Sequence, residues 1–164
     1  MKNFRLLVIL VTGFLFLSAC NEDEDLGAKA DFVGAWDVVD VDIEINVNGQ
    51  DIEDYLGQDE ANLYKALISS EIESIFDGAT ITLNSNNTYT SDIPGESSVT
   101  GTWTLRNNKL ILDEGSSDEF EFTVLSSSSS KLELQYTDID NSSDIDFDGT
   151  NDEFEVIVDM TYIK

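Results

Sequence analysis

The stretch GTWTLRNNKLIL, residues 101–112, places large apolar side chains at alternate positions on both sides of an Asn-Asn pair. Trp103 and Leu105 precede the pair, and Leu110 and Leu112 follow it. A period of two is typical of β-strands with one buried face, and asparagine tolerates the left-handed backbone of a tight hairpin turn. The segment therefore predicts two antiparallel strands joined by a short turn.

The same alternation continues on both sides of this hairpin. Polar turns separate the alternating segments, such as residues 84–87 and the serine run at 126–130, which we interpret as a five-residue hairpin loop. Eight strands in sequential order are enough to close a small up-and-down antiparallel barrel. The six further strands are expected near residues 34–47, 81–83, 88–90, 120–124, 132–136 and 154–162.

The first expected strand contains a change of parity. Trp36 and Val38 share one face, whereas Val39 starts a second apolar series that continues at Val41 and Ile43. One extra residue at the Val38–Val39 step predicts a β-bulge, which would bend the strand as a closing barrel requires.

Residues 51–77 change to apolar spacings of three and four, which are typical of amphipathic helices. We expect a short helical turn followed by a helix of about 17 residues, with Asp51 and Asp59 as N-caps and Gly57 and Gly78 as stops. The predicted fold is therefore mainly β: an eight-stranded antiparallel barrel with a helical insertion between strands 1 and 2. The insertion could be a fixed cover or a moving lid.

The amino terminus has the pattern of a secretory signal peptide. Two cations precede an apolar run at 6–17, which is too short for a comfortable membrane span. The sequence Leu-Ser-Ala-Cys then ends at Cys20 and resembles the bacterial lipobox. This resemblance implies that residues 1–19 are removed and that Cys20 carries a lipid anchor. Cys20 is the single cysteine, so no intramolecular disulfide can form.

The chain is strongly acidic after this segment. Without residues 1–19, six Lys and Arg stand against 34 Asp and Glu, a net charge of −28. Such a surface repels nucleic acid, so nucleic-acid binding is excluded. We expect an acidic tether at 20–30 and a folded domain at 31–164. The acidic run at 21–25 resembles the export signal of surface lipoproteins of the Bacteroidetes, which implies an outer-membrane, surface-exposed location, with a periplasm-facing one as the alternative.

Several motifs together resemble the lipocalins. Gly34-Ala35-Trp36 resembles their Gly-x-Trp signature, in which the tryptophan closes the bottom of the barrel. The segments at 81–90, 101–112 and 122–138 resemble, in order and character, the lipocalin-like domain common in Bacteroidetes lipoproteins. The resemblance spans about residues 31–164. It implies a small barrel often tethered to the outer membrane, and no catalytic residue can be carried over from it.

The expected barrel interior is apolar and aromatic, and it could be either filled or hollow. The only arginine of the mature chain, Arg106, sits beside a turn, so a buried carboxylate would lack a partner. We therefore expect any interior ligand to be apolar and neutral or cationic. The residues expected to contact it are Trp36, Tyr89, Trp103, Phe120, Phe122, Tyr136 and Phe154.

The segment DIDFDGTNDEFE, residues 144–155, fits the pattern of a twelve-residue calcium loop. Its oxygen donors favour Ca²⁺ over transition metals, and Gly149 permits the sharp turn. The flanking residues alternate as strands rather than as the helices of an EF-hand, so a solvated acidic loop is the alternative. The expected ligands are Asp144, Asp146, Asp148, the carbonyl of Thr150, Asp152 and Glu155.

The chain has no histidine, and its single cysteine is expected to be lipidated, so we expect no enzymatic activity. The leading hypothesis is a surface-exposed, outer-membrane lipoprotein that acts as a binding module and holds a structural calcium ion. The alternative is a structural or adhesion module with a filled barrel, acting on proteins or glycans through its acidic exterior.

Overall fold

The computed structural model describes residues 29–164. The expected signal peptide, the lipidated Cys20 and most of the expected tether lie outside these residues. The described elements are α2 (Lys29–Phe32), β1 (Gly34–Val47), β2 (Gln50–Asp51), α3 (Ile52–Leu56), α4 (Gln58–Phe76), β3 (Thr80–Leu83), β4 (Thr88–Asp92), β5 (Val99–Arg106), β6 (Lys109–Leu112), β7 (Phe120–Ser127), β8 (Lys131–Ser143) and β9 (Asp152–Ile163).

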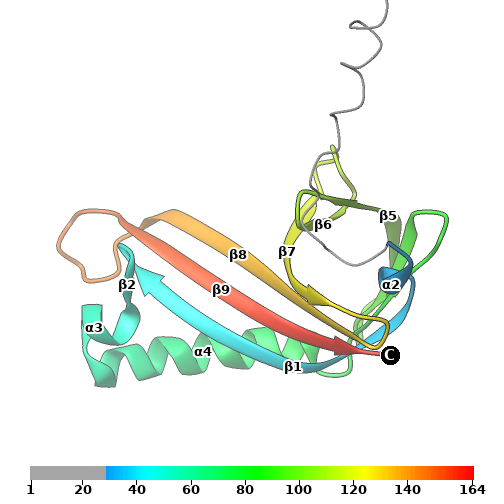
Figure 1. Ribbon diagram of the computed structural model, residues 1–164. Coiled ribbons are helices and arrows are strands. Elements are labelled where there is room, and N and C mark those ends of the chain that lie inside the picture. The colour runs from blue at the N-terminus through cyan, green and yellow to red at the C-terminus, as the bar shows by residue number, and fades with distance from the viewer. Residues whose placement is uncertain (1–28) are drawn as a thin grey trace, which may run out of the picture.

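The strands form one antiparallel sheet that closes on itself (Figure 1). β1 and β3 to β9 are hydrogen-bonded in sequential order, and β1 also pairs with β9. The two-residue strand β2 pairs only with the end of β1. The predicted fold class is confirmed: the protein is an eight-stranded antiparallel barrel, with its helical insertion between the first two barrel strands, β1 and β3.

The predicted bulge in β1 is also confirmed. Val38 lies opposite Tyr162 and Asp40 lies opposite Thr161, which leaves Val39 as the extra residue. A second register shift occurs in β7, between Val124 and Ser126.

The serine loop is shorter than we predicted, because β7 continues to Ser127 and β8 begins at Lys131.

The hairpin at 101–112 forms as expected. Arg106 pairs with Lys109, and the two intervening residues, Asn107 and Asn108, have φ angles of 51° and 61°. Positive φ at both central positions matches the twist of the adjoining strands, and asparagine adopts it at low cost.

The caps of the two helices were only partly predicted. The Asp51 carboxylate accepts a hydrogen bond of 2.7 Å from the Glu53 amide and caps α3, and Gly57 ends that helix. Gly57 is also the N-cap of α4, so the assignment of Asp59 as N-cap was wrong. Asp59 lies in the first turn, where its charge favours the helix dipole. Within residues 29–164, no helix combines the length and apolarity needed to cross a membrane.

Three strands extend well beyond the barrel. β8 pairs with β7 no further than Gln135, but it pairs with β9 as far as Ser143. β3 covers β1 only as far as Asp37, whereas β9 follows β1 to Val47. Residues 43–47, 136–143 and 152–158 thus form a three-stranded extension, which we call the arm (Figure 1).

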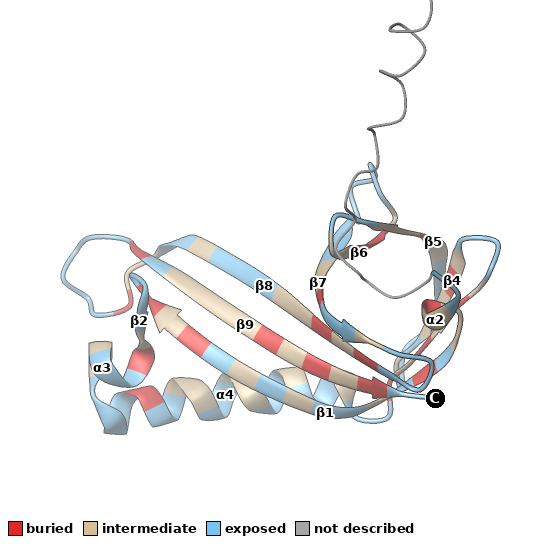
Figure 2. Ribbon diagram, in the orientation of Figure 1, coloured by how far each residue is buried: buried red, intermediate tan, exposed pale blue. Residues whose placement is uncertain are grey.

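The barrel and the arm have separate apolar cores. The barrel core includes Trp36, Trp103 and Leu134. The core of the arm contains Ile45 and Val47, together with residues of α3, α4 and the loop after β8. α4 lies along the arm; burial alternates along β1 through both parts, and along β9 only within the barrel (Figure 2).

Trp36 closes one end of the barrel. Its indole N–H donates a hydrogen bond of 2.7 Å to the Phe32 carbonyl, which comes from α2. The ammonium of Lys164 lies 4.3 Å from the centroid of the Trp36 ring. Gly34 has a φ of 145°, and a Cβ there would meet the Lys164 side chain at 2.7 Å. The absence of a side chain at Gly34 therefore leaves room for Lys164 over Trp36.

Candidate functional site

The structure divides the seven predicted ligand-contacting residues into two groups. Trp36, Trp103 and Tyr89 are buried in the barrel core. The Trp103 indole donates to the Asn84 carbonyl at 3.0 Å, and the Tyr89 hydroxyl donates to the Asp113 carboxylate at 2.7 Å. These three side chains occupy the interior, where loop residues hold Trp103 and Tyr89 and α2 holds Trp36.

Phe120, Phe122 and Tyr136 form a more open cluster, which we call the aromatic trio. Their ring centroids lie 5.8 to 6.5 Å apart. Phe120 is 49% exposed, while Phe122 and Tyr136 are half-buried and pack against the barrel core. The exposed ring of Phe120, backed by two partly buried rings, offers an apolar contact surface.

The aromatic trio lies at the end of the barrel core that is remote from Trp36. Along β9, Tyr162 pairs with Leu132, whereas Val158 pairs with Tyr136. Tyr136 is also the first residue of β8 beyond its pairing with β7. The trio therefore stands where the barrel opens toward the arm.

On the same face of β8, the side chain beyond the aromatic trio is acidic. Leu132 and Leu134 are buried, Tyr136 is half-buried, and Asp138 is exposed. Burial raises the pKa of Tyr136, and the nearby charge of Asp138 raises this pKa further. An anion bound at the trio would be repelled by this carboxylate.

The cations of the barrel are peripheral, as expected. Arg106 forms an exposed ion pair of 2.8 Å with Glu114, and Lys109 pairs with Glu121. Among residues 29–164, the buried side chains include no lysine or arginine, and Asp152 is the only charged one.

Phe154 lies apart from the aromatic trio. It is half-buried and packs against the core of the arm, which contains Ile45 and Val47. The predicted set of contacts is thus distributed over the barrel core, the trio and the arm.

The acidic loop connects β8 to β9 at the far end of the arm. Three of its predicted ligands, Asp144, Asp146 and Asp152, each place a carboxylate oxygen within 4.8 Å of the others. Asp144 accepts hydrogen bonds from the amides of Asp148 and Gly149, at 3.1 and 2.9 Å. These bonds hold the loop in a tight turn around the three carboxylates.

Asp152 is the most firmly fixed of the three. Its carboxylate accepts hydrogen bonds from the Ile145 amide at 2.8 Å, the Tyr55 hydroxyl at 2.8 Å and the Asn48 side chain at 2.7 Å. The bond from the Ile145 amide, followed by that from Tyr55, holds the pKa of Asp152 below its usual range. The carboxylate therefore stays ionised, as a cation ligand must be.

The other predicted ligands are not brought into this group. Asp148 accepts a hydrogen bond of 2.7 Å from the Thr150 amide, and Thr150 is exposed. Glu155 lies within β9, where it accepts a bond of 3.2 Å from the Asn46 side chain. The carboxylates of Asp148 and Glu155 would have to move to join the three gathered aspartates.

Tyr55 and Asn48 were not identified from the sequence. The Tyr55 hydroxyl contacts both Asp152 and Asp146, and the Asp152 bond is the main cause of its raised pKa. Asn48-Gly49 after an alternating strand is a strong hairpin signal and could have placed Asn48 at a turn. Nothing in the sequence pattern points to Tyr55.

Two hollows border α4. One, of about 500 Å³, lies between the bulge of β1 and the end of the helix, and its lining includes Val39, Glu73 and Phe76. The other, of about 340 Å³, lies between α3, α4 and the acidic loop, and its lining includes Leu63 and Phe147.

Comparison with known proteins gives one match. The family model of the lipocalin-like domain matches residues 32–134, more than half of the chain. The match includes β1 with Trp36 and ends within β8, before the acidic loop. No curated protein and no solved structure matches the chain. With its closed barrel and its family match, the chain belongs to the lipocalin-like domain family.

Proposed function

We propose that this protein is a membrane-anchored, non-enzymatic binding module that holds a small apolar ligand at the aromatic trio. A lipocalin-like barrel suggests small-molecule binding, and the observation that carries the proposal is the aromatic cluster in which the exposed Phe120 lies beside the partly buried Phe122 and Tyr136. A ligand that covers these rings would remove apolar surface from water, which is the main source of affinity at such sites.

The charge around the aromatic trio supports a neutral or cationic ligand. Asp138 follows Tyr136 on the same face of β8, and the buried side chains of the described residues supply no cation. A positively charged head group is attracted both to a carboxylate and to the face of an aromatic ring. A carboxylate or sulfate would find no buried partner here.

Binding of three probes with the same alkyl chain tests this proposal. We expect an alkyl trimethylammonium ion and the neutral alcohol to bind below their micelle-forming concentrations, and the alkyl sulfate not to bind. Phe120→Ala should weaken binding about tenfold, since part of one aromatic side chain is lost. Leu125→Ala is the matched control, because Leu125 is equally exposed on the same strand. Tight binding of the sulfate, or equal effects of the two variants, would contradict the proposal.

A structural calcium ion is the second part of the proposal. Asp144, Asp146 and Asp152 offer the hard oxygen donors that Ca²⁺ prefers, and Asp152 is already fixed by its hydrogen bonds. The ion would offset the repulsion between these carboxylates and order the last hairpin. Isothermal titration with Ca²⁺ tests this directly, and we expect weak binding of about 10⁻⁴ to 10⁻³ M.

Anchoring through Cys20 and exposure at the outer surface complete the proposal. The support is the sequence alone: the lipobox-like residues that end at Cys20 and the acidic run that follows. Metabolic labelling with a fatty-acid analogue should mark the wild-type protein and not Cys20→Ser. Protease treatment of intact cells should then degrade the domain if it faces outward and spare it if it faces the periplasm.

A structural or adhesion role is the second candidate, and the filled barrel end favours it. Trp36, Trp103 and Tyr89 occupy interior space that a ligand would need. Native mass spectrometry of the purified protein, with and without chelation of calcium, separates the two candidates. A co-purified small molecule supports the binding module, and a bare chain that binds none of the three probes supports the structural role.

A further inference from the structure

The most exposed large apolar side chains lie on α4 and on the acidic loop beside it. Phe147 is 84% exposed, Leu67 is 63% exposed and Leu63 is 62% exposed, the three highest values for large apolar residues among those described. Phe147 and Leu63 line the same groove of about 340 Å³, with Leu56 and Ile145 also on its wall. Apolar residues concentrated in this way mark contact surfaces more often than scattered ones do.

The groove opens on one side of α4. Tyr64 and Ile68 pack against the core of the arm, while Leu63 and Leu67, one helical turn apart, form the adjoining stripe. The groove shared by Leu63 and Phe147 lies between α4 and the acidic loop. This side of α4 therefore keeps an apolar stripe in contact with water.

The backbone of the loop holds Phe147 outward. Its φ is 62°, a left-handed conformation that bulky residues rarely adopt. The next amide, that of Asp148, donates to both Asp144 and Asp146, at 3.1 and 3.0 Å, which fixes the turn. Residues held in such strained backbone conformations cluster at functional sites.

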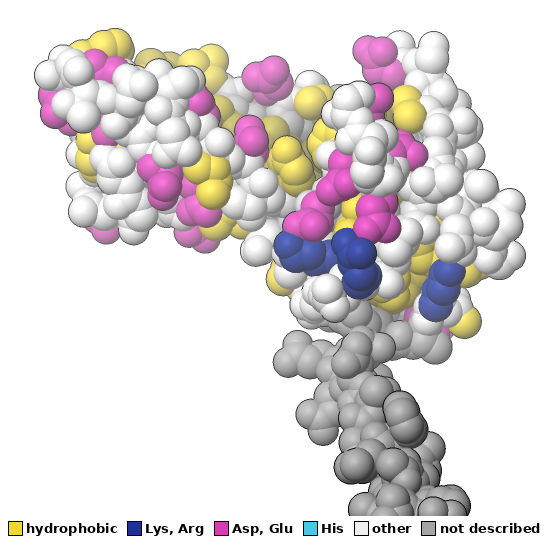
Figure 3. All heavy atoms as spheres, turned by 90° about the horizontal axis from the view of Figure 1, so that it is seen from above, with side chains coloured by type: hydrophobic (Ala, Val, Ile, Leu, Met, Phe, Trp, Pro, Cys, Tyr) yellow, Lys and Arg dark blue, Asp and Glu magenta, His cyan; other side chains and the backbone are white. Residues whose placement is uncertain are grey.

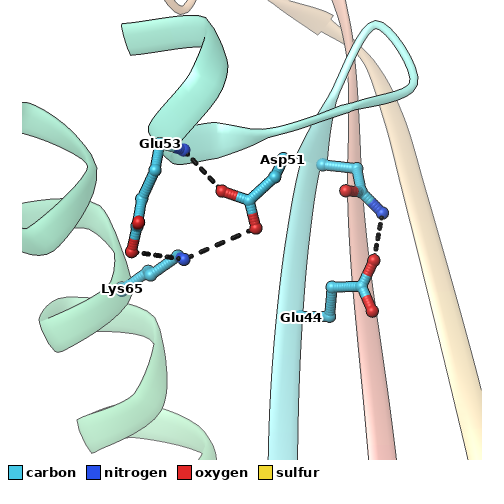
Figure 4. A network of polar contacts seen from close by, with 5 residues as sticks. Glu44, Asp51, Glu53 and Lys65 are labelled. Atoms are coloured by element: carbon cyan, nitrogen blue, oxygen red, sulfur yellow. Dashed lines mark hydrogen bonds and ion pairs between the residues drawn. The ribbon is translucent and has the colours of Figure 1, made fainter. Parts of the chain in front are cut away.

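Negative charge surrounds the groove. Glu60 and Asp146 are on its lining. Lys65 is the only lysine or arginine between residues 30 and 105, and it is paired with Asp51 at 3.6 Å and Glu53 at 2.9 Å (Figure 4). On the face seen in Figure 3, lysine and arginine gather on the barrel, whereas the arm shows acidic and apolar side chains.

We propose that this groove docks a basic amphipathic segment of a partner protein. Apolar side chains of the segment would cover Phe147, Leu63 and Leu67, and its lysines or arginines would face Glu60 and Asp146. Charge selects this occupant, because a second copy of a chain with a net charge of −26 would repel the same carboxylates. An anionic bilayer would be repelled in the same way. The site is separate from the aromatic trio and uses a different part of the fold.

Fluorescence anisotropy with designed peptides tests the proposal. The probe is a labelled helical peptide with leucine on one face and lysine on the other, and the comparison peptide carries glutamate in place of lysine. A chelator in the buffer makes the result independent of calcium. We expect the purified protein to bind the lysine peptide and not the glutamate peptide. Phe147→Ser and Leu63→Ser should each weaken binding about tenfold.

Leu125→Ser is the matched control and should leave binding unchanged, since Leu125 is exposed on β7, away from the groove. Because the substituted side chains are exposed, all three variants should keep the melting temperature of the wild type. Absence of binding, equal binding of both peptides or equal loss in the Leu125 variant would overturn the proposal. So would self-association or binding to anionic vesicles that Phe147→Ser abolishes, because another occupant would then take the groove.

Discussion

The hydroxyl of Tyr55 on α3 donates a hydrogen bond of 2.8 Å to Asp152, the first residue of β9, across 97 positions of the chain. The same hydroxyl lies 3.1 Å from Asp146 of the acidic loop. This single group therefore ties the helical insertion to both the loop and the last strand. The position of the insertion and the shape of the acidic cluster depend on each other.

Removal of that hydroxyl should loosen the end of the arm. Tyr55→Phe keeps the ring but takes one of three donors from the nearly buried Asp152 carboxylate, so we expect a lower melting temperature by circular dichroism. Tyr64→Phe is the control, because the hydroxyl of Tyr64 makes none of these bonds. If both variants have the melting temperature of the wild type, the hydrogen bond of Tyr55 adds nothing to stability.

The ionisation of Asp152 predicts the effect of acid. Its pKa is lower in the folded chain than its ordinary value, so its contribution is complete above that ordinary value of about 3.9 and is lost as the pH falls through the folded pKa. Melting temperatures measured from pH 6 downward in the presence of chelator should therefore decline below about pH 4. Asp152→Asn should flatten this decline but not abolish it, because Asp113, Asp140 and Glu133 also have lowered pKa values. If the melting temperatures of the wild type and of Asp152→Asn decline in parallel with falling pH, Asp152 does not contribute to the acid dependence.

Calcium should raise the stability of the wild-type protein. At a concentration roughly 10 to 100 times the dissociation constant, the gain is about 1–3 kcal/mol. Asp146→Asn should lose this gain, since it removes one of the three gathered carboxylates. Asp118→Asn, in the exposed loop between β6 and β7, should keep it. If calcium leaves the melting temperature of the wild-type protein unchanged, the proposed metal site is wrong.

Gly101 should not tolerate a side chain. A Cβ there would lie 2.1 Å from the carboxylate of Asp113, which accepts hydrogen bonds from the Thr102 amide and the Tyr89 hydroxyl. We expect Gly101→Ala to be clearly destabilising in chemical denaturation. In an Asp113→Ala background the same change should cost much less, because the colliding group is gone. If Gly101→Ala lowers the free energy of unfolding equally in both backgrounds, the destabilisation does not come from a clash with Asp113.

Hydrogen exchange should show whether α4 is a fixed cover or a moving lid. Ala61 is the only buried residue of α4, so we expect the amides of this helix to exchange faster than those of β9. Ile72 and Phe76 pack against the barrel core, and a ligand at the aromatic trio should slow exchange at that end if the helix closes on it. Uniform protection with and without ligand would identify a fixed cover.

The barrel was predictable because its strands have one buried and one more solvated face, and Leu132 and Leu134, each more buried than its neighbours on β8, show that pattern. The arm was not predicted, because the outer half of β8 follows Tyr136 with Thr137, Asp138 and Asn141, exposed residues that leave no alternation (Figure 2). A strand without a buried face carries no periodic signal.

The acidic loop shows a second limit of the sequence pattern. In an EF-hand a helix follows the calcium loop, and this helix brings the last residue of the loop back to the ion. Here β9 begins at Asp152, so Asp152 and Glu155, three residues apart, fall on opposite faces of a strand. The pattern correctly grouped Asp144 with Asp146, whereas Tyr55 and Asn48 depend on the tertiary fold.

β1 and β9 run without interruption through the cores of both barrel and arm. Because both cores are built on these two strands, we expect the barrel and the arm to melt in one cooperative transition. Evolutionary change at the tip of the arm is thereby constrained by the stability of the entire domain, even though the family match ends before the acidic loop.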